Sequence, residues 1–568
     1  MYIDIVPNRK SPPAILLRES IRQGGKIVKR TLANLSALSI EQAEAIRAVL
    51  KGEPLAPVDE LFDIIRSRSH GAVQAVGSAM KRLRLGTLLD RKASRERDLV
   101  LAMIAARVVD PQSKLATARS WEHSTLGEWF GVEDANEDEL YAALDWLLER
   151  QGVIEQRLAK RHLSEGARVL YDLSSSYVEG ACCPLARLGY SRDGKKGKLQ
   201  VNYGLLTDAR GRPVSISVFE GNTSDPATLL PQVKRLKADF ALQSVILVGD
   251  RGMISQKQID ALQGQAGVQW ISALKSGAIR KLVNAGCIQP DLFDERNLFE
   301  LTHEDFPGER LVVCRNPQLA KLRTHKRREL LMATTEELQT VQRMVANGRL
   351  KDEAKIGVRV GRVLNKYKMA KHVRLQIETE HFTFEIDEQQ VAEEAALDGL
   401  YIIRTCVPAT ELSSEEAVRH YKSLSQVEAA FRSLKSVDLQ VRPIRHYSED
   451  RVRAHLFLCM LAYYVKWHMS EAWRQLLFAD EDQQRLSERD PVAPATRSEG
   501  ALEKIASKCL NDGSPAHSFR TLLNELATLV RNTCRRKAAG ADERYFELDT
   551  TPNTKQREAL RLIDAIRL

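Results

Sequence analysis

The sequence has few cysteines, and their spacing excludes the common zinc sites. Eight cysteines are spread over 568 residues, none in a Cys-x-x-Cys pair, and no cysteine and histidine group has zinc-finger spacing. The longest apolar run, 455–469, is too short to cross a membrane and contains Lys466. The N-terminus has neither the pattern of a signal peptide nor a cleavage site. These absences predict a cytoplasmic, thiol-reduced protein without structural zinc.

The charge balance is basic, and the composition is that of a folded protein. Hydrophobic residues make up 43% of the chain and charged residues 28%, which is typical of soluble globular proteins. The net charge of +10 favours a polyanionic partner, most simply nucleic acid. A length of 568 residues predicts several domains, because one hydrophobic core rarely grows that large.

The period of the hydrophobic residues changes along the chain and divides it into five segments. Residues 1–165 begin as short strands and continue as helices, and residues 166–275 read as β-β-β-α-β-α-β. Residues 276–400 interrupt this pattern with helices and an alternating hairpin, residues 401–475 resume it, and residues 476–568 are helical. Three meandering strands followed by alternation indicate an α/β fold of the ribonuclease H-like type, a mixed sheet interrupted here by an insertion domain.

Two aspartates follow apolar strand sequences in this core. Asp172 lies inside the first strand, after "VLY", and Asp250 closes "VILVGD". In a ribonuclease H-like sheet these two strands are neighbours, and the strand order reverses between them. Functional sites of open α/β sheets collect at such a switch point. Each aspartate also has a structural alternative: Asp172 as a turn former, and Asp250 as a cap of the turn into its helix.

A third acid, Glu428, lies in "YKSLSQVEAAFRSLK", which reads as one helix over 421–435. At about 100° per residue, steps of seven return to nearly the same direction. Tyr421, Glu428 and Lys435 therefore form one stripe, with Arg432 close beside it. The alternative for Glu428 alone is an ordinary surface glutamate.

Together the three acids predict a metal site. Two aspartates and a glutamate are an all-oxygen ligand set suited to Mg²⁺ or Mn²⁺. Two such ions can activate a water or a 3′-hydroxyl and stabilise the leaving oxygen of a phosphodiester. Without metal, three converging carboxylates would repel one another, so the cluster is costly unless it has a use.

These residues resemble those of bacterial insertion-sequence transposases of the DDE type, in the IS-four-like superfamily. Members carry Tyr, two residues, Arg, three residues, Glu, six residues, Lys. The chain has Tyr421, Leu424, Glu428 and Lys435, so it departs at the arginine, for which Arg432 is a possible substitute. "FEGNTSD", "VGDRGM" and "ALDGLYIIRT" are similar to the surrounding blocks of these enzymes. The resemblance spans roughly 165–460.

The resemblance implies a catalytic triad of Asp172, Asp250 and Glu428 with two Mg²⁺ or Mn²⁺ ions. The implied reaction is metal-dependent cleavage at the transposon ends and transfer of the freed 3′-hydroxyl into target DNA. The implied partner is double-stranded DNA, bound by a homodimer in a synaptic complex, which places the protein at the nucleoid. The helical C-terminal region is a candidate for dimerisation.

The resemblance also implies DNA contacts. Tyr421 and Lys435 would contact phosphates of the transposon end, and Lys275 could reach a phosphate or be a solvated lysine. Tyr401 stands where relatives can have an aromatic residue that stacks on a flipped base. A tyrosine in the core of a strand is the alternative for Tyr401, and the sequence does not decide between the two.

Recognition of the element ends is expected within residues 1–165, without an assigned surface. Residues 125–146 are spaced like a helix-turn-helix, but the second helix opens with three acids, which would repel DNA. We interpret it as a packing helix. Better phosphate binders are the basic stretch 321–328 and a later cluster: Arg442, Arg445, His446, Arg451 and Arg453. Either group could also be a solvated face.

Two other functions compete with a transposase. A metal-dependent nuclease of the same fold would cut DNA without joining it. A transposase-derived DNA-binding protein would have no activity, although the presence of all three acids argues against that function. The sequence does not give the inverted repeat, the target site or the host.

Overall fold

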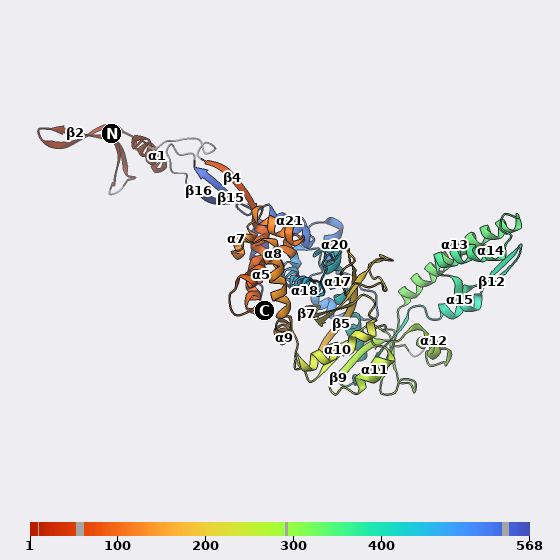
Figure 1. Cartoon of the computed structure of the whole chain (residues 1–568). Helices are drawn as coiled ribbons and strands as arrows, with labels where there is room; N and C mark the ends of the chain where they lie inside the picture. Colours follow the sequence, from red (N-terminus) through yellow and green to blue (C-terminus); the bar gives the residue numbers. More distant parts are fainter. Residues whose placement is uncertain (9–10, 53–61, 290–292, 537–544) are drawn as a thin grey trace. The chain divides into compact units, whose positions relative to one another are not determined.

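The computed structural model describes residues 1–8, 11–52, 62–289, 293–536 and 545–568, and Figure 1 shows it. The chain forms two compact units. The first, here the terminal unit, consists of Met1–Arg68 and Val530–Thr551. The second, the core unit, consists of Ser69–Leu529 and Pro552–Leu568. Residue 165, predicted from the sequence as a domain boundary, therefore lies inside the core unit.

The terminal unit contains two small antiparallel sheets. The first has the order β1-β2-β3 and packs its apolar face on a helix through Ile3, Ile15 and Ala43. Its elements are β1 (Tyr2–Val6), β2 (Ala14–Gln23), β3 (Lys26–Asn34) and α1 (Ile40–Leu50). The capping box of Ser39 and Gln42 fixes where the helix begins. The strands predicted near the N-terminus are present.

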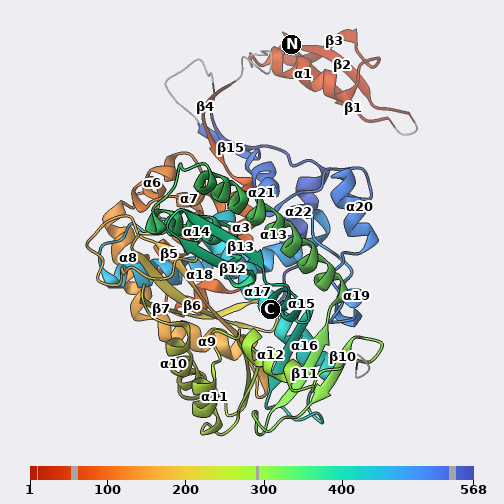
Figure 2. The ribbon, with the colours of Figure 1, turned by 90° about the vertical axis from the view of Figure 1, so that its right-hand side faces the viewer.

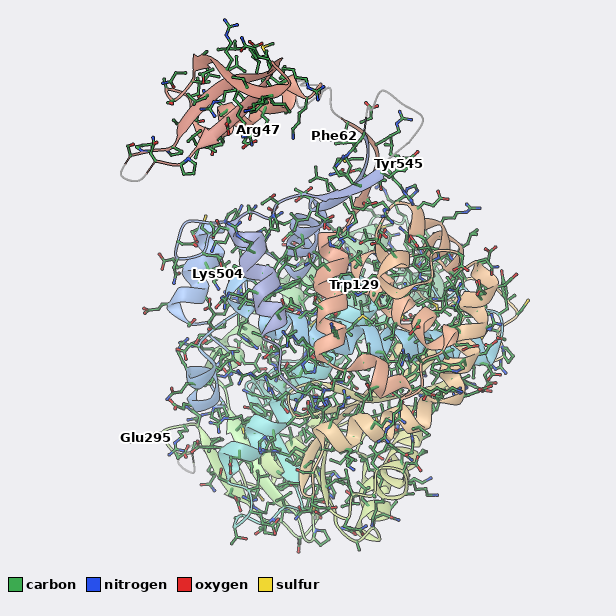
Figure 3. The ribbon with its side chains drawn as sticks, turned by 90° about the vertical axis from the view of Figure 1, so that its left-hand side faces the viewer. Arg47, Phe62, Trp129, Glu295, Lys504 and Tyr545 are labelled. Carbon is green, nitrogen blue, oxygen red and sulfur yellow. The ribbon has the colours of Figure 1, made fainter. Side chains whose placement is uncertain are left out.

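The second sheet of the terminal unit joins distant parts of the chain. Its order is β16-β15-β4, with β4 at Phe62–Ser69, β15 at Val530–Arg536 and β16 at Tyr545–Asp549. The rings of Phe62 and Phe546 meet edge to face at 5.5 Å. Figure 3 labels Phe62 on β4 and Tyr545 on β16. The region after residue 475 is mainly helical, as the sequence predicts, but β15 and β16 are strands that the sequence did not indicate and that form one sheet with β4.

The core unit is built on an eight-stranded mixed sheet with the order β10-β11-β14-β9-β8-β5-β6-β7. This sheet is the ribonuclease H-like core that the sequence predicts. Its strands are β5 (Ala167–Tyr177), β6 (Gln200–Asp208), β7 (Pro213–Glu220), β8 (Val245–Val248), β9 (Val268–Ala273), β10 (Leu298–Leu301), β11 (Arg310–Arg315) and β14 (Leu400–Thr405).

The strand order reverses beside β5. On one side β6 pairs antiparallel with β5, and β7 pairs antiparallel with β6. On the other side β8 pairs in parallel with β5, with Leu170 opposite Val248. β6 is buried along its whole length, as expected for a strand covered on both faces. The carboxyl ends of β5 and β8 therefore lie together at a switch point.

Strands β10 and β11 belong to this sheet, although they lie in the segment 276–400. Because β11 pairs with β14 and β14 with β9, they extend the sheet at the edge farthest from β7. The separate part of the segment begins only at α13 (Pro317–Ala346), a single helix that unites the basic stretch and the polar helix read from the sequence.

The remainder of this segment forms a small layer with its own core. Figures 1 and 2 show α13 and α14 side by side with a hairpin. Buried apolar residues join them, among them Leu338, Ile356 and Phe382. The elements are α14 (Glu353–Tyr367), β12 (Val373–Glu378), β13 (His381–Ile386) and α15 (Glu388–Ala395), with α12 (Ser276–Asn284) preceding β10.

Helices from both ends of the core unit pack around α18 (Glu449–Ala472), which is buried on nearly every face. α18 holds the apolar run 455–469, and no helix among the described residues is long and apolar enough to span a membrane. In chain order, the helices of the core unit before α12 are α3 (Gly71–Arg82), α4 (Leu85–Leu89), α5 (Arg95–Val109), α6 (Lys114–Arg119), α7 (Leu126–Phe130), α8 (Glu137–Glu149), α9 (Gln151–His162), α10 (Asp225–Ala238) and α11 (Gln256–Gln263). Those after α18 are α19 (Gln483–Glu488), α20 (Glu499–Ser507), α21 (Phe519–Ala527) and α22 (Thr554–Asp564). The helices with the main contacts to α18 are α3, α5, α8 and α22.

The segment spaced like a helix-turn-helix is part of this packing. α8 buries Leu140, Ala143, Leu144 and Leu147 against α5 and α18. Trp129 of α7, labelled in Figure 3, fills the space over Gly77, where any side chain would overlap its indole ring. The interpretation of α8 as a packing helix is confirmed.

The predicted helix 421–435 is broken in the structure. α16 (Ser414–Lys422) ends at Ser423, and α17 (Leu424–Arg432) begins there. One turn of π-helix follows over Ser433–Val437. The wider π turn shifts the direction of the residues after Arg432, so a stripe drawn at a constant 100° does not continue to Lys435.

Candidate active site

The three predicted acids line one cavity of about 810 Å³, here called the acidic cavity. Asp172 comes from β5, Asp250 from the turn after β8, and Glu428 from α17. The first two are brought together by the parallel pairing of β5 with β8. Glu428 is added by α17, which packs on β5. The sequence placed these acids correctly on their elements, and the fold gives them a common space.

Asp172 is half-buried in the wall of this cavity. Its Oδ1 accepts a hydrogen bond from the backbone N–H of Leu173 at 2.8 Å. Burial raises the pKa of Asp172 to about 7, and the charges of Asp250 and Asp225 add to this effect. A cation placed beside it would favour the ionised form.

Asp250 lies two positions after the end of β8 and has a turn-forming role as well. Its Oδ1 accepts the backbone N–H groups of Gly252 at 3.0 Å and Met253 at 2.7 Å. The structural alternative considered for Asp250 is therefore present. The same bonds fix the orientation of its carboxylate in the wall of the cavity.

Glu428 is exposed, and Tyr421 lies close to all three acids. Tyr421 is half-buried near the end of α16. Burial raises the pKa of Tyr421 to about 12, and the charges of Asp250, Glu428 and Asp172 act in the same direction. The phenol is thus within the electrostatic reach of the whole acidic group.

The donor set fits a hard divalent cation, although the three carboxylates line a shared space without converging on one point. Among the residues that the structure describes, no three His, Cys, Asp or Glu side chains form a ready metal-holding group. Asp172, Asp250 and Glu428 offer only carboxylate oxygens to their cavity, and these are the ligands that Mg²⁺ and Mn²⁺ prefer. The pKa of Asp172 is raised mainly by burial, and the nearby charge of Arg192 offsets this only in part.

Lys435 lines the acidic cavity together with Glu428, but it is not the open cation that the stripe predicted. It is buried, and its Nζ donates to Asp193 Oδ1 at 2.9 Å. Arg442 donates to the same oxygen at 2.7 Å. Its charge is therefore already paired inside the protein. Arg432, by contrast, is exposed and lines the acidic cavity.

A second cavity, of about 680 Å³, is here called the basic cavity. Tyr401 and Tyr421 line it, and five cations in its wall have no ion-pair partner among the described residues: Arg251, Arg280, Arg323, Lys326 and Lys422. Tyr401 is half-buried on β14, opposite Cys314, and Lys422 Nζ lies 5.5 Å from its ring centroid. Tyr401 is therefore both a strand residue and part of a cavity wall, so both of its predicted roles remain.

Lys275 lies beside this cavity but is not in its wall. It precedes α12 and is exposed, and its neighbours Leu274 and Ser276 are the wall residues. The phosphate contact of Lys275 stays a prediction.

The two basic groups predicted from the sequence, the stretch 321–328 and the later cluster 442–453, differ in how many of their cations form ion pairs. Arg442, Arg445, Arg451 and Arg453 pair with Asp193, Glu179, Asp145 and Glu449, respectively. Burial lowers the pKa of His446 to about 3, so it carries no charge at neutral pH. Of the lysines and arginines in 321–328, only Arg327 pairs with acids of the described chain, chiefly Asp398. The later cluster is thus largely neutralised by neighbouring acids, whereas the earlier stretch supplies cations to the basic cavity.

Several wall residues were missed by sequence reasoning. Tyr190 and Arg192 line the acidic cavity from the segment between β5 and β6, and Arg251 and Arg280 line the basic one. The glycine- and lysine-rich "GYSRDGKKGK" was the available signal for the first pair, but it has no hydrophobic period. Only Arg251, directly after Asp250, could have been suggested by position.

Comparison with known proteins places these cavities in a family context. A family model described as "Transposase DDE domain" matches residues 180–465, which include Asp250 and Glu428, while Asp172 lies just before them. A second model, "IS1634 family transposase, N-terminal domain", matches residues 3–57. No curated protein matches the chain. Among solved structures, the chain is similar to piggyBac transposase in a synaptic complex with hairpin DNA, at 9% identity and a TM-score of 0.35, covering 80% of this chain and 78% of that one.

Proposed function

The chain belongs to the DDE transposases, an enzyme family that acts on DNA and depends on divalent metal ions, and we propose that it cuts and joins the ends of its own insertion sequence. The proposed reaction hydrolyses the phosphodiester at each element end and transfers the freed 3′-hydroxyl to target DNA. The observation that carries this proposal is the common cavity of Asp172, Asp250 and Glu428.

The three acids are the proposed catalytic residues. Asp172 and Asp250 would hold metal from the strand ends, and Glu428 would complete the ligand set from α17. Two Mg²⁺ or Mn²⁺ ions, when bound, would lower the pKa of the attacking hydroxyl or water and neutralise the leaving oxygen. The protein's own contribution is to orient these carboxylates, as the two backbone N–H groups do for Asp250.

The proposed DNA contacts lie around both cavities. Arg432 is an exposed cation in the wall of the acidic cavity, and Tyr421 is close to the acids. The unpaired cations of the basic cavity suit the phosphates of a strand that leaves the acidic cavity, with Tyr401 beside them and Lys275 at the rim. Lys435 would act through Asp193, as a positioning residue, unless DNA displaces that ion pair.

We also propose how the protein recognises the element ends and assembles on them. The match of residues 3–57 to a transposase N-terminal domain supports a role of the 1–165 region in binding the element ends. Two ends must be brought together, which favours a homodimer in a synaptic complex at the nucleoid, with residues 476–568 as a candidate dimer surface.

Single-turnover cleavage of a labelled duplex tests the proposal. The duplex carries the terminal inverted repeat found beside the coding sequence. We expect cleavage and joining with Mg²⁺ or Mn²⁺, little or none with Ca²⁺, and none in EDTA. Cleavage without joining would identify a nuclease, and full activity in EDTA would refute the metal site.

The matched pair Glu428→Gln and Glu416→Gln tests the third acid. Both substitutions remove one charge from neighbouring helices, but Glu416 caps α16 through the backbone N–H of Ser413 at 3.0 Å. We expect the Glu428 variant to bind DNA without cutting it, and the Glu416 variant to cut. The reverse result would mean that the third acid has been assigned to the wrong residue.

A further inference from the structure

The segment 178–199, between β5 and β6, borders the acidic cavity and contributes Tyr190 and Arg192 to its wall. Neither residue belongs to the acidic triad. Their placement matters because the proposed function, on which the inference about them rests, puts DNA in this cavity.

A buried carboxylate anchors the segment beside Arg192. The side chain of Asp193 is only 1% exposed and accepts three hydrogen bonds. The donors are the backbone N–H of Tyr177 at 3.1 Å, Lys435 at 2.9 Å and Arg442 at 2.7 Å. The backbone N–H of Arg192 also donates to Ser175 Oγ at 3.1 Å. Charge-assisted bonds of this kind hold the backbone at Arg192 in one place.

A seam of two glycines anchors the segment on the other side of Tyr190. A Cβ atom on Gly189 would overlap the carbonyl oxygen of Gly221, and one on Gly221 would overlap that of Gln200. Gln200 Nε2 donates to the carbonyl oxygens of Tyr190 at 3.0 Å and Gly221 at 2.8 Å. The two backbones can approach this closely only because both positions lack a side chain.

The ring held by this fixed backbone is open to solvent. Tyr190 is 82% exposed, and Arg192 Cζ lies 5.9 Å from its ring centroid. A large aromatic ring on a rigid backbone at the edge of a reaction cavity offers a flat face for stacking. Nucleic-acid bases stack on such faces regardless of their sequence.

Arg192 has a carboxylate partner that a phosphate group can replace. It forms an ion pair with Asp225 at the start of α10, and both residues line the acidic cavity. Its planar guanidinium matches the oxygens of a phosphate as well as those of a carboxylate. The exposed Lys195, Lys196 and Lys198 follow it and add positive charge to the same segment.

We propose that Tyr190 and Arg192 form a platform for one unpaired nucleotide of the DNA next to the bond that is cut. The ring of Tyr190 stacks on the base, and Arg192 exchanges Asp225 for the adjoining phosphate. The occupant is an unpaired nucleotide because a base within a duplex already has both faces covered by its neighbours. The platform is separate from Tyr401, which lines the basic cavity.

Binding measured in EDTA tests the platform without requiring catalysis. The probes are two fluorescent DNAs with the same element-end duplex, one blunt and one with a single-stranded extension at the cut. Tyr190→Ala should weaken binding of the extended probe by about five- to a hundredfold, the effect of losing one base stack. It should leave the blunt probe unaffected. Tyr190→Phe keeps the ring and should bind like the wild type, whereas Tyr190→Leu keeps apolar volume and should not.

A matched control is available in Tyr447, which is 69% exposed and lines neither cavity. Tyr447→Ala should bind both probes like the wild type. Equal losses for Tyr190→Ala and Tyr447→Ala, or equal losses on both probes, would overturn the platform.

The salt dependence of binding separates a phosphate contact of Arg192 from a structural role. Arg192→Ala should reduce the slope of log K against log salt concentration by about 0.7 to 0.9, as expected for one lost phosphate contact. Arg192→Lys should retain the slope. A weaker affinity with an unchanged slope would show that Arg192 only supports Asp225, and it would overturn the assignment.

Failure of this inference is distinguishable from failure of the proposed function. The wild type could fail to cut DNA while Tyr190→Ala still binds the extended probe more weakly than the wild type does. This result would support the platform and refute the proposed transposase reaction. Should the wild type cut and Glu428→Gln not, while Tyr190→Ala binds the extended probe normally, the reaction stands and the platform is refuted.

Discussion

The acidic and basic cavities lie in the same unit and differ in which of their charges are paired. In the acidic cavity, the cations Arg192 and Lys435 are paired with Asp225 and Asp193, whereas the exposed Arg432 and the triad carboxylates form no ion pair among the described residues. In the basic cavity the acids are the paired groups: Asp398 with Arg327, and Glu394 with Lys371. Ion pairs thus involve two of the three wall cations in the acidic cavity and both wall acids in the basic cavity.

This difference indicates that the two cavities need different partners. The acidic one requires cations from solution, and the basic one requires an anion. A phosphodiester bound with metal ions supplies both, because its reacting group can lie at the carboxylates while its neighbouring phosphates lie at the arginines. Tyr421 and Arg251 join the two regions, since Tyr421 lines the basic cavity near the acids and Arg251 directly follows Asp250.

The largest effect should come from neutralising an unpaired acid instead of a paired one. Asp250→Asn and Asp225→Asn remove one charge each from the same cavity, but Asp225 is already compensated by Arg192. We expect Asp250→Asn to slow single-turnover cleavage at least about a thousandfold, because metal ligation supplies several kcal/mol of transition-state stabilisation. Asp225→Asn should cost far less. Equal losses of cleavage rate in the two variants would mean that the ion pair of Asp225 with Arg192 does not separate its role from that of Asp250.

Reversing charge in the basic cavity should have the next largest effect, on binding. Arg280→Glu combined with Arg323→Glu should lower the salt slope of DNA binding by about two, one per lost phosphate contact. Arg362→Glu, an exposed position on α14 outside the cavity wall, is the control. A control variant that loses as much affinity as the double variant would show that only the overall charge matters.

Lys435→Ala should mainly affect stability. Removing one of three donors to the buried Asp193 carboxylate should lower the free energy of unfolding by about 1–3 kcal/mol, measured by denaturant titration. The salt slope of DNA binding should stay unchanged. A flattened slope in a variant of normal stability would restore the phosphate contact predicted from the sequence.

The smallest effect should come from Tyr421→Phe, which removes only a hydroxyl between the two cavities. One lost hydrogen bond is worth about 0.5–1.5 kcal/mol, so single-turnover cleavage should fall by no more than about tenfold. A change in cleavage without a change in affinity would place the hydroxyl at the reacting group. The opposite pattern would place it on the DNA backbone.

The acids could be predicted from sequence because their elements are defined locally. "VLYD" and "VILVGD" are short apolar runs whose strand character needs no distant partner, and the order of elements then makes β5 and β8 neighbours. The structural alternative for Asp250 was equally readable, since its carboxylate binds the turn directly after it.

The environment of Lys435 could not be predicted in this way. Its partner Asp193 is 242 positions earlier in the chain, in a segment without hydrophobic period. The π turn at Ser433–Val437 also shifts the helix phase on which the predicted stripe depended. The place of Tyr190 at the acidic cavity could not be predicted for a related reason. It depends on the contact of Gly189 with Gly221 and not on the neighbours of Tyr190 in sequence.

The pairing of β4 with β15 has a consequence for how the protein is made. A ribosome completes β4 about 460 residues before it reaches Val530, so at about 5–20 residues per second β4 waits roughly 20–90 s for its partner strand. During that time the nascent chain carries an unpaired strand edge, which is a site for aggregation or capture by chaperones. A chain terminated before Val530 would lack β15 and would keep that edge of β4 unpaired. The edge of β4 that β15 covers in the full chain would then expose incomplete transposase molecules to chaperones and proteases.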